Sequence, residues 1–320
     1  MKRAMFLAIA LFGFGSAAAQ SENYPVRAIR LIVPFAAGGG NDILARVISQ
    51  RLTERWGQPA VVENKPGAGG NIGAEFVARS TPDGYTLLLA TNTVTMAPWL
   101  TAKTPFDVQQ DFSPVALLAS TPFALVVAPQ LPFTTVAELV AFGRANPGRL
   151  SYASVGVGTP HHLGMELFKS LTGTDLLHVP YKGSVPALTD VAANRAQAML
   201  VTINAAAPFI QGSRVRVLAV AERRRIAQMN DVPTAIEAGV ADFEVSAWYA
   251  LLAPAKTPDQ VVRKLAAELT QLFSEPELRE RLAPVGFELS PGTPEQLRAL
   301  IHADFEKWGR VVKAAGLKAE

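Results

Sequence analysis

Short runs of apolar, often β-branched residues alternate along this chain with longer segments whose apolar positions recur every three or four residues. The short runs have the length and composition of strands, and they cover residues 28–35, 59–65, 85–91, 124–129, 150–155, 196–203 and 215–221. The segment 42–56 shows the helical pattern, because one face of it carries Ile43, Leu44, Val47, Ile48 and Leu52. Segments 135–148 and 160–173 have similar spacing. Strand and helix in alternation predict an α/β protein with mainly parallel sheets.

The C-terminal quarter changes to purely helical patterns after a last apolar run, in which Trp248 and Tyr249 are expected to be core aromatics of a strand. The helical segments are 257–273, 275–286 and 293–315. Thr257 and Thr293 each stand before a proline and have a glutamine three residues later, which is the arrangement of a capping box. We therefore predict surface helices that begin at these threonines and complete a domain.

Two glycine-containing turns connect a predicted strand to a predicted helix in the same manner. The first is PFAAGGGND, residues 34–42, and the second is SVGVGTPHH, residues 154–162, where Thr159 can cap the helix and Pro160 can occupy its first position. A turn of this kind points backbone N–H groups at an anion. Because open sheets bind ligands at the carboxyl ends of their strands, two such turns in separate lobes predict a cleft with an electropositive helix start on each wall.

The N-terminus has the pattern of a secretory signal peptide. Lys2 and Arg3 precede an apolar run too short to span a bilayer, and small residues at 17–19 offer a cleavage site. We predict a leader over residues 1–19 and an exported, soluble mature chain that does not insert into a membrane. Loss of the leader lowers the formal net charge of +3 by two, which leaves no broad basic field for nucleic acid. The chain contains no cysteine, so its core must hold the fold.

Other chemistry suggested by the two turns rests on incomplete motifs. Gly38 and Gly40 match two glycines of G-x-G-x-x-G, but Ile43 stands at the third position, where it would block the close approach of helix and strand. Ser154 lacks the first glycine of a nucleophile elbow. His162 has one carboxylate four residues away and no recognisable third metal ligand. An exported hydrolase that uses Ser154 and His162 stays open as an alternative.

Four longer stretches carry a family resemblance: YPVRAIRLIVPFAAGGGNDILAR, GQPAVVENKPGAGGNIGAEFVARSTPDGYTLLLAT, VPYKGSVPALTDV and DVPTAIEAG. In this order, from Tyr24 onward, they resemble the Bug family, the extracytoplasmic solute-binding proteins of tripartite tricarboxylate transporters. The resemblance implies a two-lobed, type II periplasmic-binding-protein fold with the ligand cleft between the lobes. Residues 20–121 and 245–320 would form the first lobe, and residues 122–244 the second.

The same resemblance implies a function and a site. Such a protein captures a small carboxylated solute, which is a di- or tricarboxylate, an acidic amino acid or an aromatic acid, and delivers it to a transporter of that type or a sensor, without catalysis, cofactor or metal. The residues implied to bind the ligand are Phe35, Ala36, Gly38, Gly39, Asp42, Asn71, Thr91, Asn92, Ser154, Gly156, Gly158, Thr159 and His162. Because Asp42 would repel a carboxylate, we expect it to cap the helix, orient water or pair with a ligand amine.

One stretch departs from the family pattern. Where relatives have a Gly-Gly-Gln-Val-Asp run followed by an apolar strand and Asp, this chain has ANRAQAMLVTIN, with Gln197 and Val201 in place of the two acids. The floor of the pocket, and with it the identity of the ligand, is therefore left open. A monomer is expected, because lobes that close on a ligand must be free to move.

Overall fold

The computed structural model describes residues 24–100 and 103–314, and the predicted leader lies outside them. The strands are β1 (Ile29–Val33), β2 (Ala60–Asn64), β3 (Thr86–Thr91), β4 (Phe112–Val127), β5 (Leu150–Ser154), β6 (Leu176–Pro180), β7 (Ala198–Thr202), β8 (Arg216–Val220), β9 (Ser246–Pro254) and β10 (Glu288–Gly292). The α-helices are α1 (Gly40–Trp56), α2 (Asn71–Ala78), α3 (Thr93–Met96), α4 (Val136–Ala145), α5 (Pro160–Thr172), α6 (Ser184–Ala192), α7 (Ile203–Gln211), α8 (Asp259–Phe273), α9 (Pro276–Leu282) and α10 (Pro294–Ala314). Short 3-10 helices are η1 (Ala68–Gly70), η2 (Ala97–Trp99), η3 (Ala227–Met229) and η4 (Ala283–Val285).

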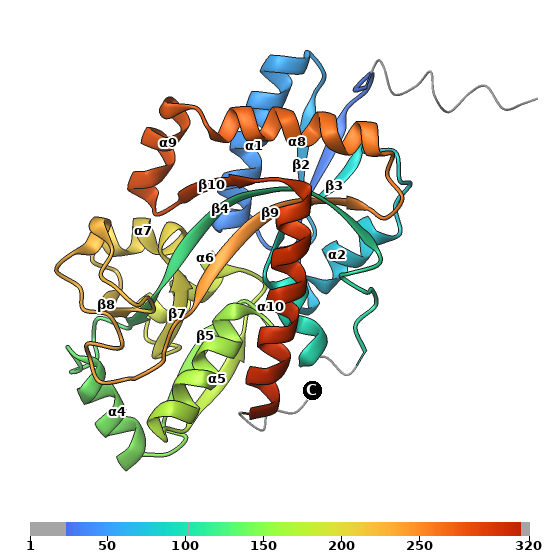
Figure 1. Cartoon of the computed structure of the whole chain (residues 1–320). Helices are drawn as coiled ribbons and strands as arrows, with labels where there is room; N and C mark the ends of the chain where they lie inside the picture. Colours follow the sequence, from blue (N-terminus) through green and yellow to red (C-terminus); the bar gives the residue numbers. More distant parts are fainter. Residues whose placement is uncertain (1–23, 101–102, 315–320) are drawn as a thin grey trace, which may run out of the picture.

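These strands join one sheet, in which two parallel units flank a pair of antiparallel strands. In one unit β1 pairs with β2 and β3, and in the other β5 pairs with β6 and β7, all in parallel. Between the units β4 and β9 pair with each other in antiparallel. Figure 1 shows β4 and β9 running side by side through the middle of the molecule, with the helices arranged around the sheet. The predicted α/β class is confirmed.

The long strand β4 connects the two halves of the sheet. From Phe112 to Pro122 it pairs with β9, whereas from Phe123 to Val127 it pairs with β7 and β8. The chain returns to the first half through β9, which also pairs with β3. The change of partner after Pro122 supports the predicted lobe boundary near residue 121, and the lobe boundaries themselves stay predictions.

The core follows the apolar faces that the sequence pattern predicts. Leu44, Ile48 and Leu52 of α1 are fully buried, and they belong to one large cluster with Leu31 of β1 and Leu87 of β3. An apolar stripe on a helix is stable only when it is buried against another element. Helix α1 is therefore fixed against the sheet, and its N-terminus is held at the carboxyl end of β1.

The two predicted capping boxes have different outcomes. At α10 the side chain of Gln296 accepts the N–H of Thr293, and the Thr293 hydroxyl accepts the N–H of Gln296, as predicted. At α8 the predicted start is wrong, because the helix begins at Asp259 and its cap position is Pro258. The Thr257 hydroxyl donates to the carbonyl of Pro254, 2.8 Å away.

A group of carboxylates lies beside the paired strands β4 and β9. Glu222, just after β8, lines a hollow together with Thr121 of β4 and Ser246 of β9. Burial, together with the charges of Glu244 and Glu288, raises the pKa of Glu222 to about 7. The ionised form of Glu222 therefore lowers the stability of the folded chain at this junction.

We expect Glu222→Gln to stabilise the protein at pH 8 and to leave its stability unchanged at pH 4. Because the pKa rises from the ordinary value of 4.5 to about 7 on folding, the folded chain keeps a proton that the unfolded chain loses, and stability falls as the pH rises through this window. Allowing for solvent screening, the gain at pH 8 should be about 1–2 kcal/mol. Urea unfolding at both pH values measures it. Glu280→Gln, at an exposed position of α9, is the control, and an equal effect of Glu222→Gln at both pH values would contradict the assignment.

Candidate functional site

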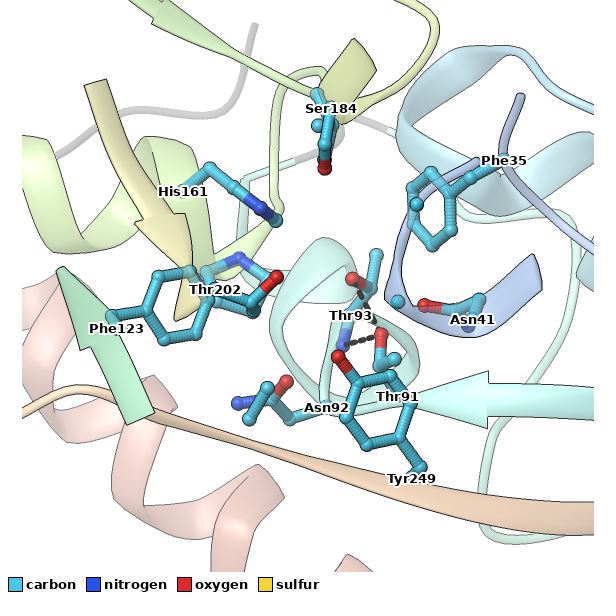
Figure 2. Close-up of a pocket in the computed structure, with 15 residues that line it drawn as sticks. Phe35, Asn41, Thr91, Asn92, Thr93, Phe123, His161, Ser184, Thr202 and Tyr249 are labelled. Carbon is cyan, nitrogen blue, oxygen red and sulfur yellow. Dashed lines mark hydrogen bonds between the residues drawn. The ribbon is translucent and has the colours of Figure 1, made fainter. Parts of the chain in front are cut away.

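A buried hollow lies where the two halves of the sheet meet. Its cavity volume is about 30 Å³, and all of its lining residues are buried. Figure 2 shows side chains from both halves turned toward this space. The lining residues are Phe35, Gly39, Gly40, Asn41, Thr91, Asn92, Thr93, Phe123, Val155, Pro160, His161, Ser184, Thr202, Ala247 and Tyr249. This set contains no Asp, Glu, Lys or Arg, so its polarity comes from hydroxyls, amides, one imidazole and the backbone.

Besides the four-residue helix α3, whose first residue Thr93 lies in the wall, four longer helices begin at this hollow. Helices α1, α5, α6 and α7 each place a first or preceding residue in its wall. The first N–H groups of a helix have no partner within the helix and give its start a partial positive charge. Within the described residues no side chain caps α1, α6 or α7. The sequence predicted helix starts at α1 and α5, and the structure adds two more.

Two hydroxyl groups in the wall can donate to an anion. The Thr91 hydroxyl donates to that of Thr93 (3.0 Å) and accepts the Thr93 N–H (3.3 Å), which leaves the hydroxyl hydrogen of Thr93 for another acceptor. The Tyr249 hydroxyl accepts from Nδ2 of Asn204 at 3.0 Å. Burial raises the pKa of Tyr249 to about 12, so this hydroxyl keeps its proton. Both groups suit a carboxylate oxygen.

His161 also faces the hollow, whereas the family resemblance implies its neighbour His162. The His161 ring lies edge-on to Phe123, with the ring centroids 5.0 Å apart. Neither ring nitrogen has a hydrogen-bond partner among the described residues. Burial lowers the pKa of His161 to about 3, so the ring is neutral. In the sequence only its place in the second turn pointed to His161, and His162 has the same place.

Four of the residues implied by the family resemblance line the hollow, namely Phe35, Gly39, Thr91 and Asn92. Two others, Asn71 and Gly156, lie beside it and line a second hollow together with Lys182. The remaining implied residues do not line the hollow, and they are Ala36, Gly38, Asp42, Ser154, Gly158, Thr159 and His162. Most of these hold the two turns in shape.

Asp42 stabilises the first turn from within. Its Oδ2 accepts from the Gly38 N–H (3.0 Å) and from Nε of Arg46 (2.8 Å), and its Oδ1 accepts from Arg46 and from Asn64. Burial alone would raise the pKa of Asp42, but these hydrogen bonds hold it below the usual range. The carboxylate is thus engaged by the protein itself. Of the roles expected for Asp42, pairing with a ligand amine does not fit this geometry.

The second turn is held by a set of internal hydrogen bonds. The Thr159 hydroxyl donates to the carbonyl of Gly156 (2.7 Å) and accepts the N–H of His162, and the predicted cap and Pro160 start of α5 are confirmed. Nδ1 of His162 accepts the N–H of Gly158 at 3.3 Å. His162 therefore lies behind the turn, where its ring stacks on that of His178 with centroids 4.2 Å apart.

Ser154 has a histidine partner, but a different one from that of the hydrolase alternative. Its Oγ lies 2.6 Å from Nε2 of His178 and accepts the N–H of Gly156 at 3.0 Å. Burial lowers the pKa of His178 to about 4, and the neighbouring His162 adds to this. The neutral His178 can accept the Ser154 proton. Because Ser154 is fully buried, no path leads an ester to its Oγ, and the pair shapes the turn.

Contacts between the two halves close the hollow. The N–H of Ala36 in the first turn donates to the carbonyl of Lys182, just before α6, at 3.1 Å. Gly69, with φ +63°, lies so close to Val157 that a Cβ would stand 2.3 Å from the Val157 carbonyl oxygen. Such close approach of two backbones is possible only without a side chain. The structure is therefore a closed form.

The two positions that depart from the family pattern lie away from the hollow. The Gln197 side chain accepts from both the N–H and the hydroxyl of Ser151, each at 2.9 Å. Val201 is fully buried in β7, where it pairs with Ala124 of β4. Neither residue contributes to the lining. The replacement of the two acids by Gln197 and Val201 thus affects the sheet of the second half rather than the floor of the hollow.

Residues 24–100 and 103–314 lack two features, a cluster of metal ligands and a membrane-spanning helix. In these ranges no three His, Asp or Glu side chains come together in a way that could hold a metal ion. No helix there is both long enough and apolar enough to cross a bilayer.

Comparison with known proteins points to one family. The family model described as "Tripartite tricarboxylate transporter family receptor" (TctC) matches residues 44–317. Protein BugT of Bordetella pertussis is 34% identical to this chain over 305 residues, which is 95% of this chain and 94% of BugT.

Two solved structures are similar over nearly the whole chain. Rpa4515 of R. palustris, solved with adipate, is 34% identical with a TM-score of 0.90, and the match covers 93% of this chain and 100% of that one. MatC of Rhodopseudomonas palustris, solved with bound malate, is 32% identical with a TM-score of 0.86, and the match covers 90% and 100%.

Proposed function

The chain belongs to the tripartite tricarboxylate transporter receptor (TctC) family of periplasmic solute-binding proteins, and we propose that it captures a small carboxylated solute in the hollow between its two lobes. The solved relatives confirm the two-lobed α/β fold. Proteins of this family bind solutes and are not enzymes. The observation that carries the proposal is the hollow itself, where four helix starts converge and no acidic side chain lines the wall.

This arrangement favours an anion without fixing its position by a charged side chain. Each helix start near a negative group contributes about 0.3–2 kcal/mol, and hydrogen bonds from N–H and hydroxyl donors add to it. Adipate in Rpa4515 and malate in MatC are both dicarboxylates, which supports the same class of ligand here.

The proposal extends to the residues, the partner and the compartment. Phe35, Gly39, Thr91 and Asn92 keep the ligand contact that the resemblance implies, and the hydroxyls of Thr93 and Tyr249 join them. The loaded protein delivers its solute to a tripartite tricarboxylate-type transporter or to a sensor. It does so in the periplasm, after removal of the predicted leader.

The proposal predicts that one or more small organic acids raise the melting temperature of the purified protein. A ligand that binds only the folded chain stabilises it by RT ln(1 + [L]/Kd), which is about 2.7 kcal/mol at 100 times Kd. A suitable panel is succinate, glutarate, adipate, citrate, aspartate, glutamate and benzoate at pH 7. Gly39→Leu should weaken the best acid at least about tenfold, because the added side chain occupies the space meant for it.

Gly39→Leu tests the location of binding without disturbing the fold. The backbone at Gly39 has φ −82°, which any residue adopts, and the nearest atom to an added Cβ is Ser184 Oγ at 3.8 Å. Ala193→Leu adds a side chain at an exposed position after α6 and serves as the control. If no acid of the panel stabilises the protein, the proposed function is wrong. If Gly39→Leu binds as well as the unchanged protein, the ligand lies elsewhere.

A further inference from the structure

The ring of His161 is a polar group whose hydrogen bonds the protein leaves unmade. The residue is 8% exposed, lines the hollow and has no partner at either ring nitrogen among the described residues. Figure 2 shows the ring directed into the hollow, beside Phe123. Buried polar groups are almost always paired, because an unpaired one loses its hydrogen bond to water. The partner of His161 is therefore to be sought in what the hollow holds.

The protonation state of His161 defines what that partner must supply. Its pKa of about 3, lowered by burial, means that the ring is neutral at neutral pH. A neutral imidazole has one N–H donor and one nitrogen acceptor. A carboxylate can satisfy the donor, but the acceptor needs a hydrogen that a fully ionised diacid does not carry.

Asn92 presents a second unmatched acceptor at the same hollow. Its Nδ2 donates to the carbonyl of Ser246 at 3.0 Å, which fixes the orientation of the amide. Its Oδ1 is buried and has no partner among the described residues. Figure 2 shows Asn92 and His161 at the border of the same space. The hollow thus offers donors for acid groups, and it has two acceptors without a partner among the described residues, one ring nitrogen of His161 and Oδ1 of Asn92.

The missing hydrogen belongs to a neutral group rather than to an ammonium. A buried ammonium needs a negative partner, and apart from the carboxylates of the ligand itself no Asp or Glu side chain lines the hollow to supply one. Asp42, the acid of the first turn, is already bonded to Arg46, Asn64 and the Gly38 N–H. A hydroxyl supplies one hydrogen-bond donor without a charge.

We propose that His161 is a specificity-determining residue of this site, and that it selects a carboxylate that carries a hydroxyl over the plain diacid and over the amino acid of the same carbon skeleton. The proposal rests on the proposed function, because it concerns the ligand of the same hollow. It narrows the expected ligands to hydroxylated acids, and it disfavours the acidic amino acids.

Matched ligand series test this selection. Each series has a plain, a hydroxylated and an aminated acid of equal length: succinate, malate and aspartate; glutarate, 2-hydroxyglutarate and glutamate; adipate, 2-hydroxyadipate and 2-aminoadipate. Isothermal titration calorimetry at pH 7 gives Kd for each, and the series with the tightest binder is scored. The hydroxylated acid should bind at least about tenfold tighter than the plain one. The aminated acid should bind more weakly than both.

Three variants assign the preference to His161. His161→Leu keeps an apolar side chain against Phe123 and removes both ring nitrogens, so both acids should bind more weakly and the preference for the hydroxylated acid should fall at least about fivefold. His161→Gln restores one donor and one acceptor and should recover most of the preference. His302→Leu is the matched control, because His302 is exposed on α10 and contacts Gln109.

The outcomes separate this proposal from the proposed function. If no acid of any series binds, the proposed function fails and the proposal fails with it. If acids bind but plain and hydroxylated forms bind equally, or if His161→Leu leaves their ratio unchanged, the proposal is wrong while the proposed function stands. If the aminated acid binds tightest, the argument from the missing acidic side chain is wrong.

Discussion

Replacing Gly183 with valine is expected to weaken ligand binding by about 100-fold while the unliganded chain keeps its stability. Gly183 precedes α6 with φ 175°, which is extended backbone that any residue adopts. A Cβ there would lie 2.8 Å from the Cβ of Ala36 in the other half, whereas carbon atoms pack at about 3.5–4.0 Å. The clash exists only while Ala36 and Gly183 are in contact, so it opposes closure alone. Overpacking of this kind costs about 1–3 kcal/mol, or up to about 100-fold in affinity.

The measurement combines calorimetry with small-angle scattering. The best acid of the panel is titrated into the unchanged protein, Gly183→Ala, Gly183→Val and the control Ala193→Val. Scattering with and without the acid then shows whether the radius of gyration falls on binding. The affinity of Gly183→Ala should lie between that of the unchanged protein and that of Gly183→Val. Unchanged affinity of Gly183→Val, or a loss of stability without ligand as large as the loss of binding energy, would refute the closure argument.

Removing the carboxylate of Asp42 is expected to lower the free energy of unfolding by about 2–3 kcal/mol at pH 7. Asp42→Ala leaves the Gly38 N–H without its acceptor in a partly buried turn and leaves the Asn64 amide with only its bond to the Phe35 carbonyl. Each lost hydrogen bond to a charged group costs about 1.5–3 kcal/mol. Part of this is recovered, because the Arg46 side chain is 60% exposed and returns to water. The turn at residues 34–42 should loosen, and ligand affinity should fall with it.

The pH dependence provides an independent check on Asp42. Since its folded pKa is lowered, its contribution is present above the unfolded value near 3.9 and is lost as the pH falls through the folded pKa. The difference between the unchanged protein and Asp42→Ala in urea unfolding should thus be constant from pH 5 to 8 and smaller at pH 3. Asp259→Ala is the control, because this first-turn acid of α8 is 89% exposed and should cost under about 1 kcal/mol. If Asp42→Ala and Asp259→Ala lose similar free energies of unfolding, Asp42 contributes only through its charge near the helix start.

The sequence pattern located the strands that lie inside each half and missed much of what joins the halves. The apolar runs at β1, β3, β5 and β7 are short and continuous because both faces of these strands are covered. Strand β4 was found only from residue 124 onward. Its earlier part contains Pro114 and Pro122 and has register shifts against β9, so it shows no regular alternation. Strand β6 was missed as well, because it lies at the end of the sheet and exposes Leu177.

Sequence-based prediction was limited in the same way for single residues of the candidate site. Residues that are adjacent in a helix point about 100° apart, so the second turn could be located from sequence while the choice between His161 and His162 could not. Tyr249 was expected in the core, and its ring does pack against Phe287, but its hydroxyl reaches the hollow. Ser184 and Thr202 start helices that lack a glycine-rich turn of the first kind, and their place in the wall follows only from the closed arrangement of the two halves.

The closed hollow has a consequence for the timing of release. Because its lining is buried and the Ala36 N–H donates to Lys182 across the halves, a solute cannot depart while this contact persists. Its residence time is then governed by how often the halves separate, and acids of quite different affinity should share one upper limit on their dissociation rate. Motions of this size occur on a microsecond-to-millisecond scale, so a receiver that pulls the halves apart could empty the protein faster than dilution alone.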